Sequence, residues 1–231
     1  MRLKLQNFHW RKSHVILGFL LAVVFTLSFS AQAADETQST APPVVVGVIS
    51  FQAMIPSEGP GSTVICPLCT AAYSTGKILK SAEKTVENIF TDKLREFKEV
   101  QIIPQERVQS VYKRTVSESL KKPLLEVLKN VGHELKADVL AVGYIYRYEE
   151  RVGYDYSTER PASVAFEIYM INPAEGDIIW RGVFDKKQKS LMEDLFQISS
   201  FFKGRGRWLT AQQLSKQGMD EIFKKFPGFT R

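Results

Sequence analysis

The sequence predicts an α/β (α+β) fold, a single three-layer-like domain in which amphipathic helices pack on a mixed β-sheet of about five strands. Two patterns lead to this prediction. Short apolar runs rich in Val and Ile indicate strands, and longer segments with an apolar residue every three or four positions indicate helices. The two alternate in the order β-α-β-α-β-β-β-α, and the folded domain is expected at 44–231.

The first predicted strand, 44–51 (VVVGVISF), is continuously apolar and β-branched, which is typical of a buried central strand. The Pro and Gly residues of 52–69 predict irregular structure. A long amphipathic helix is expected at 75–97. A short strand should follow at 100–103, where Pro104 ends it.

The second half of the chain begins with a helical turn expected at 105–113 and a second amphipathic helix at 120–135. Residues 138–148 start apolar on both faces and then alternate, which predicts a strand that leaves the core and becomes half exposed. The segments 163–171 and 177–184 flank the turn sequence NPAEG and predict an antiparallel hairpin.

The last predicted element is a helix at 210–226, with Thr210 as its cap and Pro227-Gly228 as its stop.

The amino-terminal 33 residues have the three zones of a secretory signal peptide: a basic start, an apolar run and an A-x-A site that ends at Ala33. The apolar run has about 15 residues, fewer than the roughly 20 that span a bilayer as a helix. We therefore expect cleavage after Ala33, with retention as an anchor as the alternative. Residues 34–43 are polar and end in two prolines, which predicts a disordered lead-in.

Export places the mature chain in the periplasm or cell envelope. No cysteine lies near the cleavage site, so lipidation there is not expected. Residues 1–33 contain four of the 31 Lys and Arg and none of the Asp and Glu, so their removal lowers the formal net charge from +6 to +2. This charge gives no reason to expect nucleic acid binding. Membrane contact is compatible with the sequence, but a membrane span after cleavage is not expected.

The two cysteines of the chain form one motif, Cys66-Pro67-Leu68-Cys69. In an oxidising compartment a structural disulfide is the favoured interpretation. A redox-active pair at the start of the following helix is an alternative, as is a contact with a metal or a partner. His133 is the only histidine outside the signal peptide, so a zinc site within one chain lacks ligands, although a site shared between subunits stays open.

Motifs of the common catalytic and cofactor sites are absent from the sequence. The run Ser74-Thr75-Gly76-Lys77 lacks both flanking residues of a phosphate-binding loop. We expect the partly charged imidazole of His133 to interact favourably with the dipole at the carboxyl end of its helix. The chain is therefore expected to have no cofactor and no catalytic residues, and not to be an enzyme.

Two aromatic and basic segments are candidates for binding a partner, because Tyr, Trp and Arg are the residue types enriched at protein interfaces. The preferred candidate consists of Tyr144, Tyr146, Arg147, Tyr148, Arg151, Tyr154 and Tyr156. The second surface consists of Phe201, Phe202, Lys203, Arg205, Arg207 and Trp208.

Three segments together resemble a superfamily of envelope domains: VVVGVISF, LKADVLAVGYIYRY and SVAFEIYMINPAEGDIIWRGVF. They are similar to segments of the TolB amino-terminal domain, the curli-secretion (CsgG-like) lipoprotein and the penicillin-binding-protein activator (LpoB-like) lipoprotein, and they cover most of 44–186. The resemblance implies a compact α/β domain that binds other envelope proteins. It does not imply a channel, because the membrane-spanning hairpins and the lipidation cysteine of the curli protein have no counterparts here.

The expected function is therefore that of a non-catalytic module in envelope assembly or secretion, whose partners are other envelope proteins or a second copy of itself. Two alternatives stay open at this point. One is a periplasmic thiol–disulfide protein that uses Cys66 and Cys69, and the other is a self-assembling ring component of a secretion system.

Overall fold

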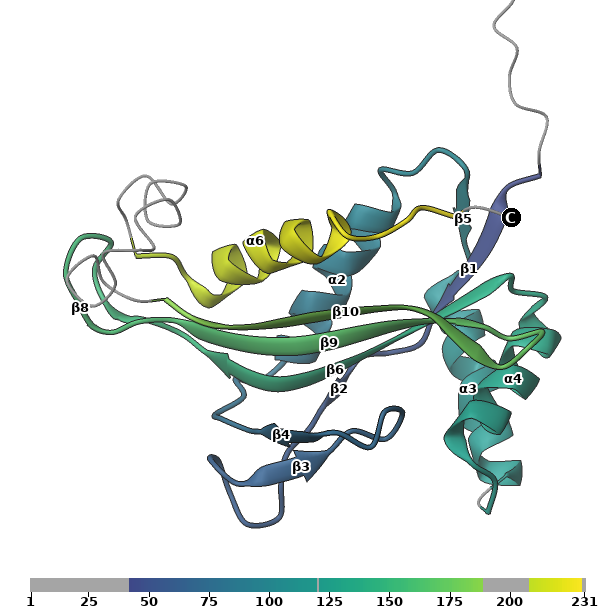
Figure 1. Ribbon diagram of the computed structural model, residues 1–231, viewed down its shortest axis with the longest axis horizontal. Helices are drawn as coiled ribbons and strands as arrows, with labels where there is room; N and C mark the ends of the chain where they lie inside the picture. The colour runs from purple at the N-terminus through teal and green to yellow at the C-terminus, as the bar shows by residue number, and fades with distance from the viewer. Residues whose placement is uncertain (1–41, 120, 189–207, 230–231) are drawn as a thin grey trace, which may run out of the picture. The chain divides into compact units, whose positions relative to one another are not determined.

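A six-stranded mixed sheet forms the centre of the fold (Figure 1). Its strand order is β10-β9-β6-β1-β5, and β2 pairs with β6 beside this path. The computed structural model describes residues 42–119, 121–188 and 208–229, all within the compact unit Pro42–Arg231. The predicted signal peptide and all but the last two residues of the lead-in lie outside this range.

The sheet strands are β1 (Val44–Val48), β2 (Gln52–Ala53), β5 (Val100–Ile102), β6 (Val139–Glu149), β9 (Ser163–Asn172) and β10 (Asp177–Lys187). Two small hairpins add β3 (Thr63–Ile65) with β4 (Ala72–Ser74), and β7 (Val152–Gly153) with β8 (Thr158–Arg160). The described helices are α2 (Ala82–Leu94), α3 (Gln105–Glu118), α4 (Leu124–Leu135) and α6 (Ala211–Phe223).

The strand pairing confirms the α/β fold class. β1 runs parallel to β5 on one side and to β6 on the other, so it is the interior strand that its apolar sequence predicts. β9 and β10 form the expected antiparallel hairpin, with Asp177 opposite Asn172 and Lys187 opposite Ser163. The sheet is mixed because this hairpin adds antiparallel strands to the parallel β5, β1 and β6.

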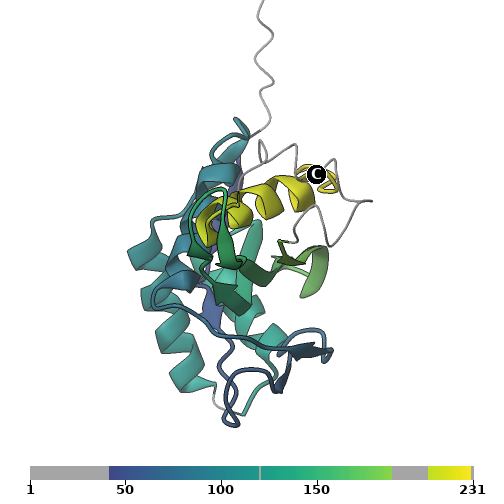
Figure 2. The same cartoon turned by 90° about the vertical axis from the view of Figure 1, so that its left-hand side faces the viewer.

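The two faces of the sheet have different covers, which makes three layers (Figures 1 and 2). Helices α2 and α6 cover one face, where Phe90, Leu214 and Phe223 pack against strand residues such as Ile168 and Phe184. Helices α3 and α4 and the β3–β4 hairpin cover the other face. Alternate residues of β6 and β9 therefore enter separate cores, as the two-residue period of a strand requires.

The final helix has the predicted cap. The Thr210 side chain accepts a hydrogen bond from Gln213 N (3.2 Å), and the Gln213 side chain accepts one from Thr210 N (3.0 Å). This reciprocal capping box satisfies two backbone donors that a helix start leaves free. The helix ends at Phe223, earlier than the expected position 226.

The helix predicted at 75–97 is shorter, and α2 spans only Ala82–Leu94. Its expected first turns are extended and follow β6 instead: Gly76 N donates to Tyr146 O (3.0 Å), and Leu79 N donates to Tyr148 O (3.2 Å). Ser81, with φ of 63°, then turns the chain into the helix. The turn predicted at 105–113 is in contrast a full helix, α3, which continues to Glu118.

Two predictions about exposure and irregular structure are wrong. The segment 52–69 was expected to be irregular but contains β2 and β3. The end of β6 was expected to be half exposed, yet Tyr144, Tyr146 and Tyr148 are buried. For Tyr144 and Tyr146 the two errors have one cause, because the β3–β4 hairpin packs on their face of β6. Tyr148 instead enters the core on the opposite face, with residues of α2 and α6.

Gly132 of α4 faces the turn between β9 and β10. A Cβ at this position would lie 2.1 Å from the Pro173 Cβ, which is closer than two carbon atoms can approach. Gly132→Ala is expected to destabilise the fold by about 1–3 kcal/mol, because overpacking exceeds the gain in helix propensity. Urea unfolding would measure the change, with the exposed Asn130→Ala on the same helix as a control. An equal or higher stability for Gly132→Ala would contradict this packing.

Candidate functional site

The cysteine motif lies in the turn that joins β3 to β4. Cys66 N donates to Ala71 O (2.9 Å), and Thr70 N donates to Cys66 O (3.1 Å). Thr70 completes the turn in a left-handed conformation with φ of 57°. Cys66 is buried, Cys69 is partly exposed, and both are free thiols in the structure. The disulfide therefore stays a prediction.

The interpretation that places this pair at a helix start needs correction. The cysteines occupy the turn between β3 and β4, and α2 begins only at Ala82, after the whole of β4. A helix dipole acts within about one turn of the helix end. The dipole of α2 therefore does not act on either thiol, and any stabilisation of a thiolate must come from neighbouring side chains and backbone amides.

The two thiols have close polar neighbours from β9 and β10. The Tyr169 hydroxyl lies 3.2 Å from Cys66 Sγ, and Cys69 N donates to Cys66 Sγ (3.4 Å). The Arg181 guanidinium lies 3.9 Å from Cys69 Sγ. Both sulfurs and a carboxylate oxygen of Glu167 lie within 4.8 Å of one another.

Glu167 is the centre of this cluster, and its side chain is 0% exposed. The Tyr73 hydroxyl donates to Oε1 (2.9 Å), the Tyr146 hydroxyl donates to Oε2 (3.0 Å), and Arg181 forms an ion pair with Oε1. The rings of Tyr73 and Tyr146 stack at 4.3 Å between centroids. A buried carboxylate needs such partners, because its desolvation alone would cost several kcal/mol.

These three groups do not suit a metal ion. Cys66, Cys69 and Glu167 carry donor atoms that bind metals, but both Glu167 oxygens already accept hydrogen bonds from tyrosines. In addition, the Arg181 cation lies beside Cys69 and would repel a second cation. The arrangement instead suits chemistry of the thiols themselves.

The surroundings shift the pKa values of the two thiols in opposite directions. Burial raises the pKa of Cys66. Burial also opposes ionisation of Cys69, but hydrogen bonds from the Tyr169 hydroxyl, Ala71 N–H and Cys66 outweigh it and lower the pKa of this thiol. Because the thiolate is the nucleophilic form, the lowered pKa of Cys69 and its greater exposure both favour this thiol over Cys66 as a nucleophile.

The preferred partner surface from the sequence is only partly at the surface. Tyr144, Tyr146 and Tyr148 are buried, so they cannot contact a partner in this structure. Arg147 is held by Ser163 Oγ (2.6 Å) and by an ion pair with Asp185. Alternation along β6 suggested an exposed aromatic row, but the β3–β4 hairpin covers Tyr144 and Tyr146, and Tyr148 lies in the core with α2 and α6.

The remaining tyrosines of that surface lie at the tip of the β7–β8 hairpin. Tyr154 is 82% exposed and Tyr156 is 77% exposed. Gly153, with φ of 111°, makes this turn possible, since a Cβ there would lie 2.6 Å from Ser157 O. Two large aromatic side chains therefore project from a narrow turn into solvent.

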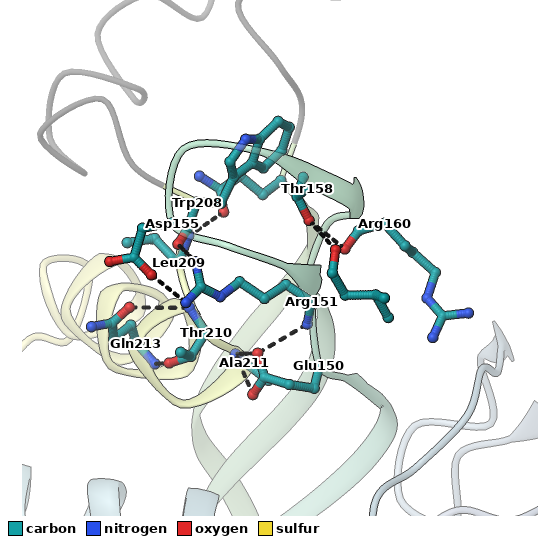
Figure 3. Close-up of polar contacts among 12 residues, drawn as sticks. Glu150, Arg151, Asp155, Thr158, Arg160, Trp208, Leu209, Thr210, Ala211 and Gln213 are labelled. Carbon is teal, nitrogen blue, oxygen red and sulfur yellow. Dashed lines mark hydrogen bonds and ion pairs between the residues drawn. The ribbon is translucent and has the colours of Figure 1, made fainter.

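Contacts with the start of α6 hold this hairpin in place (Figure 3). Arg151 forms an ion pair with Asp155 and donates to the Trp208 carbonyl (2.9 Å). Trp208 N donates in turn to Asp155 O (2.7 Å). The Glu150 carboxylate accepts from Ala211 N at 3.1 and 3.2 Å. Arg151 thus positions the hairpin and is not free to bind a partner.

Most of the second predicted surface, Phe201, Phe202, Lys203, Arg205 and Arg207, lies outside the described residues. Trp208 is partly buried and contributes the backbone contacts to the hairpin. His133 is exposed in the last turn of α4, the place that the sequence suggested. Among the described residues, no helix is long and apolar enough to cross a membrane.

Sequence reasoning missed Glu167, Arg181, Tyr73 and Tyr169 as parts of a site. One signal was available, because Glu167 is the single charged residue within the apolar strand SVAFEIYMI. A charge at an inward position of a buried strand requires a partner. The other three residues are ordinary strand residues in the sequence, and only the pairing of β9 with β10 and the position of β4 bring them together.

No protein-family model matches the chain, and neither does any curated protein. Some solved structures are similar to it. The PelC dodecamer from Paraburkholderia phytofirmans is 11% identical, with a TM-score of 0.43 over 79% of this chain and 85% of that one. Lipoprotein GNA1162 from Neisseria meningitidis is 9% identical, with a TM-score of 0.41 over 71% of this chain and 94% of that one.

The carboxy-terminal domain of LpoB from Escherichia coli is also similar, at 11% identity and a TM-score of 0.39 over 65% of this chain and 87% of that one. The solved structures similar to this chain thus include one lipoprotein, GNA1162, and a domain of LpoB. At these low scores, the function proposed below rests on the residues of this chain alone.

Proposed function

We propose that this chain is an exported cell-envelope protein that binds a protein partner through the tip of its β7–β8 hairpin. The signal-peptide pattern of 1–33 supports export, with 34–43 as the lead-in to the folded domain. The observation that supports binding is the pair of exposed tyrosines, Tyr154 and Tyr156, on a hairpin that is held in place by the hydrogen bond from Arg151 to the Trp208 carbonyl.

Exposed tyrosines favour binding for two reasons. A Tyr side chain buries a large area at a low entropic cost and can still donate a hydrogen bond through its hydroxyl. The contacts of Arg151 and Glu150 order the hairpin before a partner arrives, so less conformational entropy is lost on binding. The tip therefore suits a protein surface that offers an apolar pocket with hydrogen-bond acceptors at its rim.

Site-specific photocrosslinking in the envelope of the producing bacterium would test this surface. A photoreactive phenylalanine analogue would replace Tyr154 or Tyr156, and the control would carry it at Ile55, which is 76% exposed but lies outside the hairpin. We expect one crosslinked protein at both tyrosine positions and none of it at the control. Identical products at all three positions would contradict a specific surface.

The crosslinked partner then allows a quantitative test. Tyr154→Ala and Tyr156→Ala are each expected to weaken its binding at least tenfold, which corresponds to about 1.4 kcal/mol. Ile55→Ala should change the affinity less than twofold. Circular dichroism of each variant should equal that of the parent, since these side chains are exposed. Full affinity in the double tyrosine variant would refute the proposal.

The identity of the crosslinked protein also separates an adaptor from a self-assembling component. If it is a second copy of this chain, light scattering should give an oligomer that Tyr154→Ala dissociates. If it is another envelope protein, the purified chain should be monomeric. The prediction of a ring is tested by the same measurement.

A further inference from the structure

The cysteine cluster has a chemistry that the proposed binding surface does not use. Its thiols lie on the opposite side of the sheet from α6, on the β3–β4 hairpin, among side chains from β6, β9 and β10. Three features distinguish this pair from an inert disulfide: unequal exposure of the two sulfurs, a cation beside the outer one, and a hydroxyl beside the inner one.

We propose that Cys66 and Cys69 form a thiol–disulfide exchange site for accessible disulfides, in which Cys69 is the attacking residue and Cys66 is the resolving residue. This would be a further activity beside partner binding, and it extends the expectation of a purely non-catalytic module. The order along the chain is unusual, since the second cysteine of the motif attacks and no helix start assists it.

Access supports the role of Cys69. Its side chain is partly exposed, and both Pro67 and Thr70 on either side of it are exposed. Cys66 is only 1% exposed, so a substrate disulfide cannot reach its sulfur before Cys69 has reacted. Exchange requires an approach of the attacking sulfur to the substrate disulfide. Of the two, only Cys69 can provide this approach.

Electrostatics support the same assignment. The Arg181 guanidinium lies 3.9 Å from Cys69 Sγ. There it offsets the negative charge of its ion-pair partner Glu167, which opposes ionisation of this thiol. The Tyr169 hydroxyl interacts with both thiols and with Glu167. This hydroxyl lies 3.2 Å from Cys66 Sγ, and its hydrogen bond to Cys69 lowers the pKa of that thiol. It is therefore placed to donate to the Cys69 thiolate before attack and lies next to Cys66 when that thiol loses its proton.

The exchange takes place in two steps. The Cys69 thiolate attacks one sulfur of the substrate disulfide, a new S–S bond forms, and the other substrate sulfur leaves as a thiolate that takes a proton. Cys66 then loses its proton and attacks Cys69 Sγ, which forms the Cys66–Cys69 disulfide and releases the second substrate sulfur. The substrate disulfide is thereby reduced to two thiols and the dithiol is oxidised, with transfer of two electrons.

Mixed disulfide formation would test the roles directly, with the full chain purified as the host exports it, then reduced and mixed with glutathione disulfide at pH 7. Cys66→Ser should accumulate a mixed disulfide at Cys69, and Cys69→Ser should react at least tenfold more slowly. The unaltered chain should release two glutathione molecules and close the Cys66–Cys69 bond. Equal rates in the two variants, or a pair that neither closes with glutathione disulfide nor reopens with glutathione, would overturn the proposal.

The alkylation rate of Cys69 tests the role of Tyr169 as a positioning residue. Tyr169→Phe should slow the alkylation of Cys69 by iodoacetamide at pH 7 at least threefold, and the rates should converge above the pKa of a free thiol. Tyr144→Phe is the matched control, because Tyr144 is also buried on this face and its ring meets that of Tyr169 edge-on at 6.2 Å. A pH profile that is the same in the parent and in Tyr169→Phe would contradict this role.

A final comparison of rates distinguishes protein disulfides from low-molecular-weight disulfides as the substrate. A disulfide-bonded unstructured peptide should react faster than glutathione disulfide if proteins are the substrate. The reverse order would identify low-molecular-weight disulfides. A rate for both substrates equal to that of free cysteine would refute an exchange site altogether.

Discussion

Glu167→Ala is expected to lower the free energy of unfolding by about 2–4 kcal/mol, because it removes a buried carboxylate and leaves the hydroxyls that bond to it without an acceptor. The Tyr73 and Tyr146 hydroxyls would lose their acceptor, and the half-exposed Arg181 would lose its counter-ion. The variant also removes one contact between the β3–β4 hairpin and β9, whereas the contact of Cys66 with Tyr169 stays. Urea unfolding followed by circular dichroism would measure the loss.

Two further experiments test whether this loss is specific to Glu167. Glu58→Ala, an exposed glutamate, should change the stability by less than about 0.5 kcal/mol. In a double-mutant cycle, Arg181→Gln and Glu167→Gln should show a coupling of about 1–3 kcal/mol, since the two side chains are in direct contact. Additive effects of the two changes would show that the ion pair does not stabilise the fold.

Alkaline unfolding is the second large effect that we expect. Burial is the main reason why the pKa values of four core tyrosines are raised above their ordinary range: Tyr144, Tyr146, Tyr148 and Tyr169. A raised folded-state pKa gives stability that is fully present below the pKa of the unfolded phenol, about 10, and is lost as the pH rises toward the folded-state value.

Each such tyrosine should contribute about 1.4 kcal/mol of lost stability per pH unit above pH 10. Tyr144, Tyr146 and Tyr169 together should remove roughly 8 kcal/mol over two pH units, which is within the usual stability of a domain, so unfolding is expected near about pH 12. The part of the phenolate absorbance at 295 nm that comes from these buried side chains should appear together with the loss of the circular dichroism signal. Tyr144→Phe should make the pH dependence shallower, whereas ionisation of all eight tyrosines of the chain without loss of structure would contradict the burial of these side chains.

Patterns along the chain were enough to predict the main elements. The continuous apolar run at 44–51 gave an interior strand, and the turn sequence between 171 and 177 gave the β9–β10 hairpin. Thr210 was correct as a cap, because a capping box depends on residues only three positions apart. These features need only local sequence, so they could be predicted without knowledge of the fold.

The errors concern contacts between distant segments. The segment 75–81 fits a helical spacing, but hydrogen bonds to β6 hold it extended. The sequence pattern predicts half-exposed tyrosines in β6, but the β3–β4 hairpin buries Tyr144 and Tyr146, and the core with α2 and α6 buries Tyr148. A hairpin of three-residue strands between Pro and Gly residues has too little periodicity to be recognised, so its position and its effect on β6 were both missed.

The sequence by itself determined the export signal pattern, the α/β class, and the presence of one cysteine pair and two aromatic segments. Only the tertiary structure decided which of these residues can act. It buried three of five candidate tyrosines, left Tyr154 and Tyr156 exposed on a fixed hairpin, and placed Arg181 and Tyr169 beside the thiols. The reason is physical: periodicity reports which residues avoid water, whereas exposure and charge at a site depend on what packs above it.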